Sequence, residues 1–275
     1  GASSCAVTIS QDESIPVTFE AIGKWITEPV STSMRFGDQT SILTDTEGHQ
    51  HISFYKDHSV SGGIIYMKPA YATNASGSWV IQNVSSDFGS FAADTSIAMD
   101  SSGYIHITYQ ENGSKTLKYA TNTLGSWVVN MLDSNVNSGY SNAIAIDSLD
   151  NLHVVYGVSP GVLKYMTNAS GTWMTEILEE PGAGGSVSIA VDSLDKVHIG
   201  YSIGWSGLKH ASNASGTWVT EDVDRTLDAG GYNSIAIDSQ GKVHFSYKGS
   251  LGSGIRGSVL KYATNTTGSW VPEVI

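Results

Sequence analysis

The side chains best suited to bind a ligand are arginine, aromatic and acidic residues in loops of uneven length. They are Arg35, Phe36, Asp38, Phe88, Phe91, Asp94, Tyr140, Trp205, Arg225, Tyr232 and Arg256. An aromatic ring can stack on one face of a sugar while Asp, Asn and Ser groups hydrogen bond at its rim. This composition predicts a site for a carbohydrate or another small polar ligand. The alternative is that the rings only fill the ends of the sheets.

Five histidines recur at a constant distance from an aspartate and raise the question of a metal site. They are His51, His106, His153, His198 and His244, each six residues beyond an aspartate. Zinc ligands lie about 2 Å from the ion, whereas second strands of separate units stand at least one strand spacing, about 4.8 Å, from the innermost strand. We therefore expect structural histidines, and neither a metal nor a cofactor. The sequence also has no HExxH motif, CxxC pair or glycine-rich phosphate loop.

Two repeated sequence elements must position these residues. One is a turn before a tryptophan, "ATNASGSWV" at 72–80 in its first full copy. Its tryptophans are Trp25, in a degenerate copy, and then Trp79, Trp127, Trp173, Trp218 and Trp270. The other is an Asp-led polar turn between two runs of alternating apolar residues, which predicts a β-hairpin. Its aspartates are Asp45, Asp100, Asp147, Asp192 and Asp238.

The repeat predicts an all-β fold, a β-propeller of four-stranded antiparallel blades. A third segment such as "LKYATN" (117–122) joins the hairpin to the tryptophan turn, and a fourth such as "SWVVNML" (126–132) follows it. Successive turn aspartates stand 55, 47, 45 and 46 residues apart, which is too long for a leucine-rich or β-helical coil and right for a propeller blade. The approximate units are 31–80, 81–130, 131–175, 176–222 and 223–275, within a single domain of 1–275.

Six tryptophan turns favour six blades, of which the first, within 1–30, is abbreviated. Five blades with an N-terminal extension are the alternative. In either ring the Asp-led turns and the tryptophan turns fall on one face, while the loops of variable length fall on the opposite face, which we call the variable face. Because binding residues concentrate on variable loops held by a rigid scaffold, we expect the ligand site on the variable face.

Charge and composition disfavour several classes of partner. Lys and Arg total 14 against 26 Asp and Glu, so the formal charge is -12, which argues against nucleic acid and anionic membranes. No run of about 18 apolar residues predicts a membrane span. The single cysteine, Cys5, allows no internal disulfide. The Ser/Thr/Asn-rich composition suits an extracellular or cell-surface protein, with lipidation at Cys5 as one option. The oligomeric state is left open.

Over residues 31–275 the tryptophan turns resemble those of the Asp-box (BNR-repeat) propellers, the superfamily that includes sialidases. The family turn is Ser-x-Asp-x-Gly-x-x-Trp, whereas here an asparagine such as Asn74 holds the Asp position and the glycine, such as Gly77, comes one residue later. The resemblance implies that arginines hold a carboxylate substrate. This chain has three, Arg35, Arg225 and Arg256, all expected on the variable face. The family's catalytic Tyr-Glu pair has no match by motif, and Asp38 and Asp94 are candidate acids by loop position alone.

These observations predict a secreted or surface-displayed propeller that binds a carbohydrate or a protein partner through the variable face. A sialidase-like glycoside hydrolase or another carbohydrate-active enzyme is the alternative, and a structural spacer is a third hypothesis. A multivalent lectin should repeat its binding residues in every blade, while an enzyme should concentrate unusual residues at one site. Here the scaffold repeats and the loops vary, which favours a single site or a protein interface.

Overall fold

In the computed structural model of this protein the described residues form five antiparallel sheets of four strands each. The structure describes residues 29–30, 36–61, 64–87, 94–111, 113–204, 206–250 and 258–275. In each sheet four consecutive strands are hydrogen bonded in chain order. This confirms the expected all-β class and the four-stranded antiparallel unit. The described residues contain no helix that could cross a membrane.

The strands are numbered in chain order and grouped into sheets 1 to 5. Sheet 1 contains β1 (Phe36–Thr44), β2 (Gln50–Ser61), β3 (Ile64–Thr73) and β4 (Val80–Asn83). Sheet 2 contains β5 (Thr95–Met99), β6 (Ile105–Glu111), β7 (Thr116–Thr121) and β8 (Val128–Asp133). Sheet 3 contains β9 (Ser138–Ile146), β10 (Leu152–Val158), β11 (Val162–Thr167) and β12 (Met174–Glu179). Sheet 4 contains β13 (Ala183–Val191), β14 (Val197–Ile203), β15 (Leu208–Ser212) and β16 (Val219–Asp224). Sheet 5 contains β17 (Gly231–Ile237), β18 (Val243–Gly249), β19 (Val259–Thr264) and β20 (Val271–Val274).

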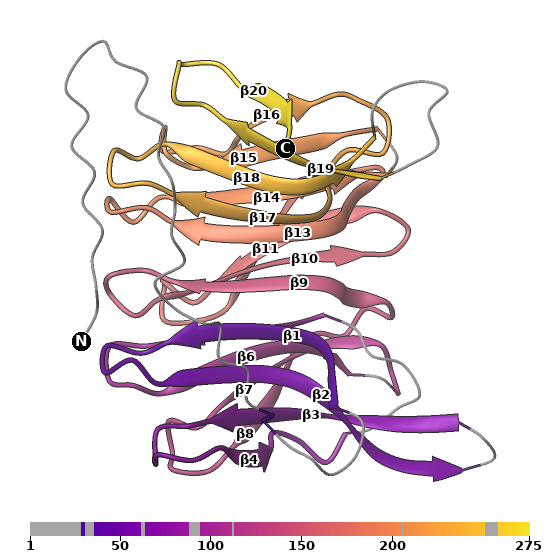
Figure 1. Cartoon of the computed structure of the whole chain (residues 1–275), viewed down its shortest axis with the longest axis vertical. Coiled ribbons are helices and arrows are strands. Elements are labelled where there is room, and N and C mark those ends of the chain that lie inside the picture. The colour runs from indigo at the N-terminus through magenta and orange to yellow at the C-terminus, as the bar shows by residue number, and fades with distance from the viewer. Residues whose placement is uncertain are drawn as a thin grey trace, which may run out of the picture.

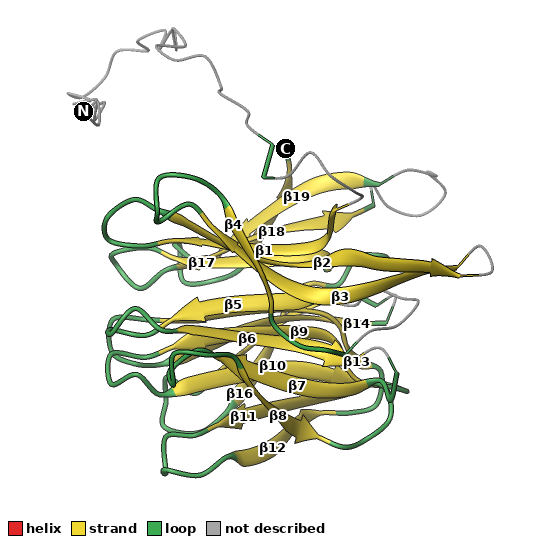
Figure 2. Cartoon of the chain, turned by 90° about the horizontal axis from the view of Figure 1, so that it is seen from below, coloured by secondary structure: helices red, strands yellow, loops and turns green. Residues whose placement is uncertain are grey.

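The first strand of each sheet lies at the centre of the assembly. β1 contacts β5, β5 contacts β9, β9 contacts β13 and β13 contacts β17. Figure 1 shows sheet 5 at the top and sheet 1 at the bottom, with strands of the other sheets between them. In Figure 2 the strands run across the view, green turns gather at the left, and β2 and β3 project farthest to the right. The Asp-led turns join first to second strands and the tryptophan turns join third to fourth strands, so both lie on one face.

Hydrogen bonds to one side chain explain why the Asp-led turn recurs. In sheet 3, Asp147 Oδ1 accepts hydrogen bonds from the backbone N–H groups of Leu149 and Asn151, at 2.9 and 2.8 Å. The turn also needs a residue with positive φ, which is Asp150 here (62°), because Asp tolerates the left-handed region better than most residues. The carboxylate therefore supplies the hydrogen-bond acceptor for two backbone N–H groups of the tight turn.

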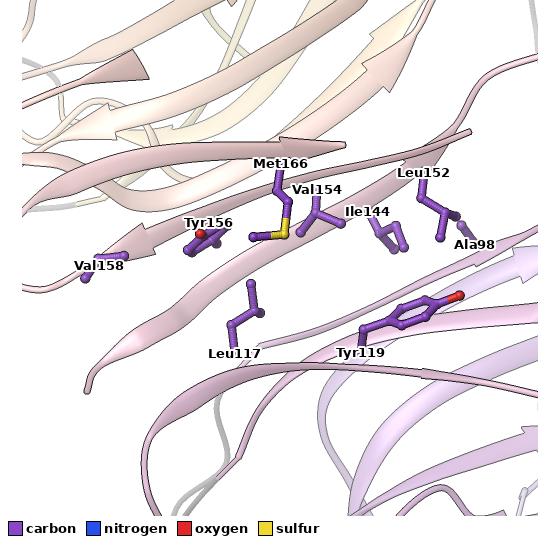
Figure 3. Close-up of a cluster of buried hydrophobic side chains, with 9 residues drawn as sticks. All are labelled: Ala98, Leu117, Tyr119, Ile144, Leu152, Val154, Tyr156, Val158 and Met166. Carbon is purple, nitrogen blue, oxygen red and sulfur yellow. The ribbon is translucent and has the colours of Figure 1, made fainter. Parts of the chain in front are cut away.

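The core consists of apolar layers between consecutive sheets. Figure 3 shows the layer between sheets 2 and 3, where Leu117 and Tyr119 meet Val154, Tyr156 and other buried side chains. Leu117, Val154 and Tyr156 are fully buried in it. Burying apolar area contributes about 25 cal/mol per Å², so these layers, rather than the individual sheets, hold the ring together.

Candidate functional site

A cavity of about 480 Å³ lies at the centre of the assembly, where all five first strands meet. Its lining comes from the middle of β1, β9, β13 and β17 and from the start of β5 with the residue before it: residues 39–42, 142–144, 187–189, 233–235 and 94–97. The side chains are mostly short and polar, with isoleucines between them. The described lining contains one carboxylate, Asp94, and no lysine or arginine.

The same strand position supplies a row of small residues around this cavity. It is the fourth residue before the turn aspartate: Ser41, Ser96, Ala143, Ser188 and Ser234. Several of these hydroxyls hold the ring together, because Ser96 Oγ accepts a hydrogen bond from the Ile144 N–H of the next sheet at 3.1 Å. Small side chains at this position leave the space that the cavity occupies.

Asn142 and Asn233 occupy equivalent positions on β9 and β17 but differ in their hydrogen bonds. Asn233 Oδ1 accepts a hydrogen bond of 2.5 Å from Ser188 Oγ. Asn142 Nδ2 donates to the backbone oxygens of Asp94 and Gly139, at 2.7 and 3.0 Å. Asn142 Oδ1 is buried and has no hydrogen-bond partner among the described residues. The oxygen has almost no accessible surface in this structure. Because an unsatisfied buried acceptor is costly by about 1–3 kcal/mol, a hydrogen bond from a ligand hydroxyl that reached it would be favourable.

Asp94, predicted from its loop position, lies in this cavity wall. Burial raises the pKa of the Asp94 carboxyl above its ordinary value, and a hydrogen bond with Ser141 offsets part of that effect. A partly desolvated carboxyl with a raised pKa is a group that can either accept hydrogen bonds from hydroxyls or donate its own proton.

The two predicted tyrosines that the structure describes behave differently. Tyr140 is half-buried, and its ring lies against Gly157, where an added Cβ would come within 2.9 Å of the Tyr140 ring. Burial raises its pKa. Tyr232 is 84% exposed and directly precedes Asn233 of the cavity lining. Tyr140 therefore fills space between strands, while the exposed Tyr232 ring is next to the cavity lining in sequence but not part of it.

Arg225 lies on the loop after β16, on the variable face, but outside the cavity lining. Its Nε and Nη2 atoms donate to Asp222 Oδ2 at 2.9 and 2.5 Å, and its side chain is 82% exposed. The described residues do not include Trp25, Arg35, Phe88, Phe91, Trp205, Arg256 or Cys5, nor the side chains of Phe36 and Asp38.

The repeated histidines bridge their turn aspartate and a ring on the third strand. In sheet 3, His153 Nε2 lies 3.2 Å from Asp147 Oδ2, and His153 Nδ1 lies 2.6 Å from the Tyr165 hydroxyl. Sheet 4 departs from this pattern, because His210 replaces the tyrosine and lies 3.1 Å from His198. Among the described residues no group of three or more His, Cys, Asp or Glu side chains is arranged to hold a metal ion.

Sequence reasoning did not single out Gln39, Asn142, Asn233 or the serine row, although all of them line the cavity. A signal was present. A small or polar residue recurs four positions before each turn aspartate, where one side of a half-buried strand would otherwise carry a larger apolar residue. Only the closing of the sheets into a ring shows that these positions face one another.

Comparison with known proteins shows the fold. A scan against protein families matched none, and a search of curated proteins found no relative. A protein of unknown function from Dyadobacter fermentans aligns with a TM-score of 0.59 at 11% identity, over 87% of this chain and 83% of its own. Aleuria aurantia lectin in complex with Fucα1-6GlcNAc aligns with a TM-score of 0.57 at 13% identity, over 86% of this chain and 95% of its own.

An ulvan lyase of polysaccharide lyase family PL25 aligns with a TM-score of 0.60 at 10% identity, over 86% of this chain and 69% of its own. Another structure of the Aleuria aurantia lectin is described as a six-bladed β-propeller. At these identities the similarity concerns architecture, and it identifies the ring of four-stranded sheets as a β-propeller fold. The sheets are therefore its blades.

Proposed function

We propose that the protein is a carbohydrate-binding β-propeller that takes a neutral saccharide at the central cavity. The observation that carries the proposal is the polar lining with a buried, unpartnered acceptor, Asn142 Oδ1. Sugar hydroxyls both donate and accept hydrogen bonds. A hydroxyl donating to Asn142 would satisfy the orphaned oxygen, and the serine hydroxyls nearby can serve as donor or acceptor.

The charge of the cavity supports a neutral ligand. Asp94 is the carboxylate of its described lining, and none of those residues is a lysine or arginine. A ligand carboxylate would meet the Asp94 charge without a cationic partner. Arg225, the described arginine of the variable face, is already paired with Asp222.

Tyr232 adds a stacking surface to the same region. Its ring is 84% exposed, and its backbone φ of 50° is uncommon for a bulky residue. Strained backbone with an exposed aromatic side chain is found where a site requires a fixed side-chain direction. In this proposal the ring packs on the apolar face of the sugar while the cavity wall binds its hydroxyls.

The proposal extends to the setting of the protein. It includes a six-bladed ring with an abbreviated first blade and kinship with the Asp-box propellers, both supported by the repeat. It also includes display outside the cell, supported by the cysteine-poor, Ser/Thr/Asn-rich composition. The lectin and the polysaccharide lyase among the propellers of similar fold both act on saccharides, as their descriptions state.

A carbohydrate-active enzyme is the second candidate, because Asp94 has the raised pKa that a general acid needs. Glycoside hydrolysis commonly needs a second carboxyl, about 5–9.5 Å away. Asp38, on the β1 strand, is the sequence-predicted candidate for it. An enzyme would release reducing ends from a bound glycan, which a binding module would not.

The test is a screen of the purified chain against neutral and sialylated glycans, followed by calorimetry on any hit. Three variants accompany it: Asn142→Ala, Tyr232→Ala and the control Tyr104→Ala. Tyr104 is a partly exposed tyrosine in an Asp-led turn, on the face opposite the variable face. Each variant must first show the thermal unfolding of the unchanged chain.

The expected result is a neutral saccharide whose affinity falls on the order of 10-fold in Asn142→Ala and Tyr232→Ala and is unchanged in Tyr104→Ala. Binding of sialylated glycans alone would overturn the neutral-ligand proposal in favour of an arginine site. A blank screen with folded protein would overturn carbohydrate binding and direct the search to a protein partner.

A further inference from the structure

Every described junction between consecutive sheets from sheet 1 to sheet 5 contains the same aromatic pair. The tryptophan of one sheet packs edge-on against a ring on the third strand of the preceding sheet. The pairs are Trp127 with Tyr71, Trp173 with Tyr119, Trp218 with Tyr165, and Trp270 with His210, with ring centroids 5.4, 5.6, 4.8 and 5.3 Å apart. The ring on which each tryptophan packs therefore belongs to the sheet that precedes its own.

Sheet 5 presents the corresponding face without a following sheet among the described residues. Leu117, Leu163 and Leu208 occupy one position on the third strands of sheets 2, 3 and 4, and each is fully buried by the next sheet. Its equivalent in sheet 5, Leu260, is 55% exposed. The ring of this face is Tyr262, which stacks on His244 of its own sheet. A face built like the other four is thus left open.

Val30, just before sheet 1, packs as a residue at the end of a preceding sheet does at the other junctions. Val84, Leu132, Leu178 and Val223 each lie five residues after a repeat tryptophan, and each packs in the layer shared with the next sheet. Val30 lies five residues after Trp25, and it packs against Phe54, Ala70 and Ala72 of sheet 1. The spacing and packing of Val30 therefore match those of the residue at the end of a fourth strand in the other junctions.

A second, independent feature of sheet 1 agrees with this placement. At the other junctions a tyrosine and a lysine of one sheet bind an acid at the end of the preceding sheet, as Tyr156 and Lys164 bind Asp133 at 2.9 and 2.8 Å. The equivalent residues of sheet 1 are Phe54 and Ala70, and both are buried.

The sequence before sheet 1 has changed in the same sense. Six residues after Trp127, Trp173 and Trp218 stand the acids Asp133, Glu179 and Asp224, and eight residues after Trp79 stands Asp87. The matching positions after Trp25 are Ser31 and Ser33. At the junction before sheet 1 the acid, the tyrosine and the lysine are therefore all replaced. This is expected if sheet 1 and the segment before it contact each other, because a single member left there would be a buried charge without a partner.

We propose that residues 1–28 close the ring as an abbreviated sixth blade between sheets 5 and 1, with Trp25 packed against Tyr262. The spacing that places Val30 on sheet 1 places Trp25 at the tryptophan position of that blade. The ring on which it packs then belongs to the blade before it, which is sheet 5. Leu260 is buried by the same segment.

A double-mutant cycle on the full chain tests this contact. Trp25→Ala, Tyr262→Ala and the double variant are unfolded with denaturant, and the Trp173→Ala and Tyr119→Ala cycle serves as the matched control for a known pair. Aromatic pairs couple beyond their buried area. We expect the Trp25 and Tyr262 substitutions to be coupled on the order of 2- to 10-fold in the unfolding equilibrium constant, as the control pair is.

A second double-mutant cycle, Trp79→Ala with Tyr262→Ala, tests the alternative that five blades form the ring and sheet 1 packs directly on sheet 5. Coupling of Tyr262 with Trp79 in place of Trp25 would overturn the proposal, because sheet 1 would then follow sheet 5 directly. If the alanine variants fold poorly, Leu260→Asp provides an alternative test of the same contact. It should lower the denaturation midpoint, whereas the control Leu124→Asp, at a 78% exposed turn position, should not. Equal midpoints for both, or a dimer by light scattering that Leu260→Asp dissociates, would show that residues 1–28 do not cover this face.

Discussion

Lys261 Nζ lies 2.8 Å from Asp224 Oδ2 across the junction of sheets 4 and 5, with the two side chains only 8% and 3% exposed. The Tyr247 hydroxyl donates to the same oxygen at 2.7 Å. Burial opposes ionisation of Asp224, but the hydrogen bond from Lys261 and further hydrogen bonds outweigh it and lower the pKa of this carboxyl. A lowered pKa means that this stabilisation is present above the unfolded value of about 3.9 and is lost as the pH falls through the folded value.

Asp224→Ala should destabilise the fold by about 3–5 kcal/mol, because it leaves the buried Lys261 ammonium without an anionic partner and with only the Thr226 hydroxyl at 2.9 Å. The control is Asp222→Ala, which removes the exposed ion pair with Arg225 and should change stability by only about 0–1 kcal/mol. Denaturant unfolding at neutral pH measures both. Equal losses of stability in the two variants would contradict the prediction that the buried Asp224–Lys261 pair matters more than the exposed Asp222–Arg225 pair.

The His198–His210 pair predicts a pH dependence of stability that arises in sheet 4. Burial, followed by the proximity of His210, lowers the pKa of His198. The groups around the pair are Asp192, 3.4 Å from His198, and Glu221, 2.9 Å from His210, with the Trp270 ring against His210. A histidine with a lowered pKa contributes stability above its unfolded value of about 6.5 and loses it as the pH falls.

His210→Tyr restores the residue type found at Tyr119 and Tyr165, and it removes the neighbour whose proximity helps to lower the pKa of His198. The variant should therefore lose less thermal stability than the unchanged chain between pH 7 and pH 5. His106, whose pKa burial also lowers, is present in both proteins and cancels in the comparison. Parallel curves of Tm against pH would show that the pair is not the titrating group.

Asp94→Asn should stabilise the fold at neutral pH. The Asp94 pKa is raised by burial, so at a pH between the unfolded and the folded pKa the folded protein holds a proton that the unfolded chain has released. Stability then decreases as the pH rises from the ordinary Asp value of about 3.9 through the folded value, and it stays lower above that point. The amide variant carries no charge and should lack this decrease. Calorimetric Tm values at several pH values check it, and an unchanged profile would show that Asp94 is well solvated.

Two glycine substitutions separate backbone strain from packing. Gly171 in a tryptophan turn has φ +85° and open space where a Cβ would project, so Gly171→Ala should lower stability by about 1–2 kcal/mol through its backbone alone. Gly171→Asn should recover part of that loss, because asparagine tolerates positive φ.

Gly200 has ordinary φ, but an added Cβ would lie 2.3 Å from Phe245 and 2.7 Å from Asn233 Oδ1. Gly200→Ala should therefore destabilise by about 1–3 kcal/mol through overpacking and also weaken ligand binding at the cavity. Recovery of Gly200→Ala by a Phe245→Leu change, but not of Gly171→Ala, would separate the two causes in denaturant unfolding.

Local pattern in the sequence was sufficient for the strands and turns of this protein. Alternating apolar residues, an aspartate that binds backbone N–H groups two and four residues on, and glycines such as Gly171 with positive φ all act within a few residues. Their physical effect does not depend on the rest of the fold. The four-stranded repeat, the all-β class and the shared face of the two turns could therefore be predicted from the residues alone.

Only the tertiary structure decided which residues meet across the ring. Asn142 and Asn233 both stand five residues before a turn aspartate, yet Ser188 satisfies the Asn233 oxygen and the Asn142 oxygen has no partner among the described residues. Tyr140 and Tyr232 both lie near the start of a first strand, but Tyr140 packs against Gly157 while Tyr232 is exposed. The physical reason is that hydrogen bonding, desolvation and stacking at the cavity depend on neighbours one or more blades away, and the closing of the sheets into a ring brings those neighbours together.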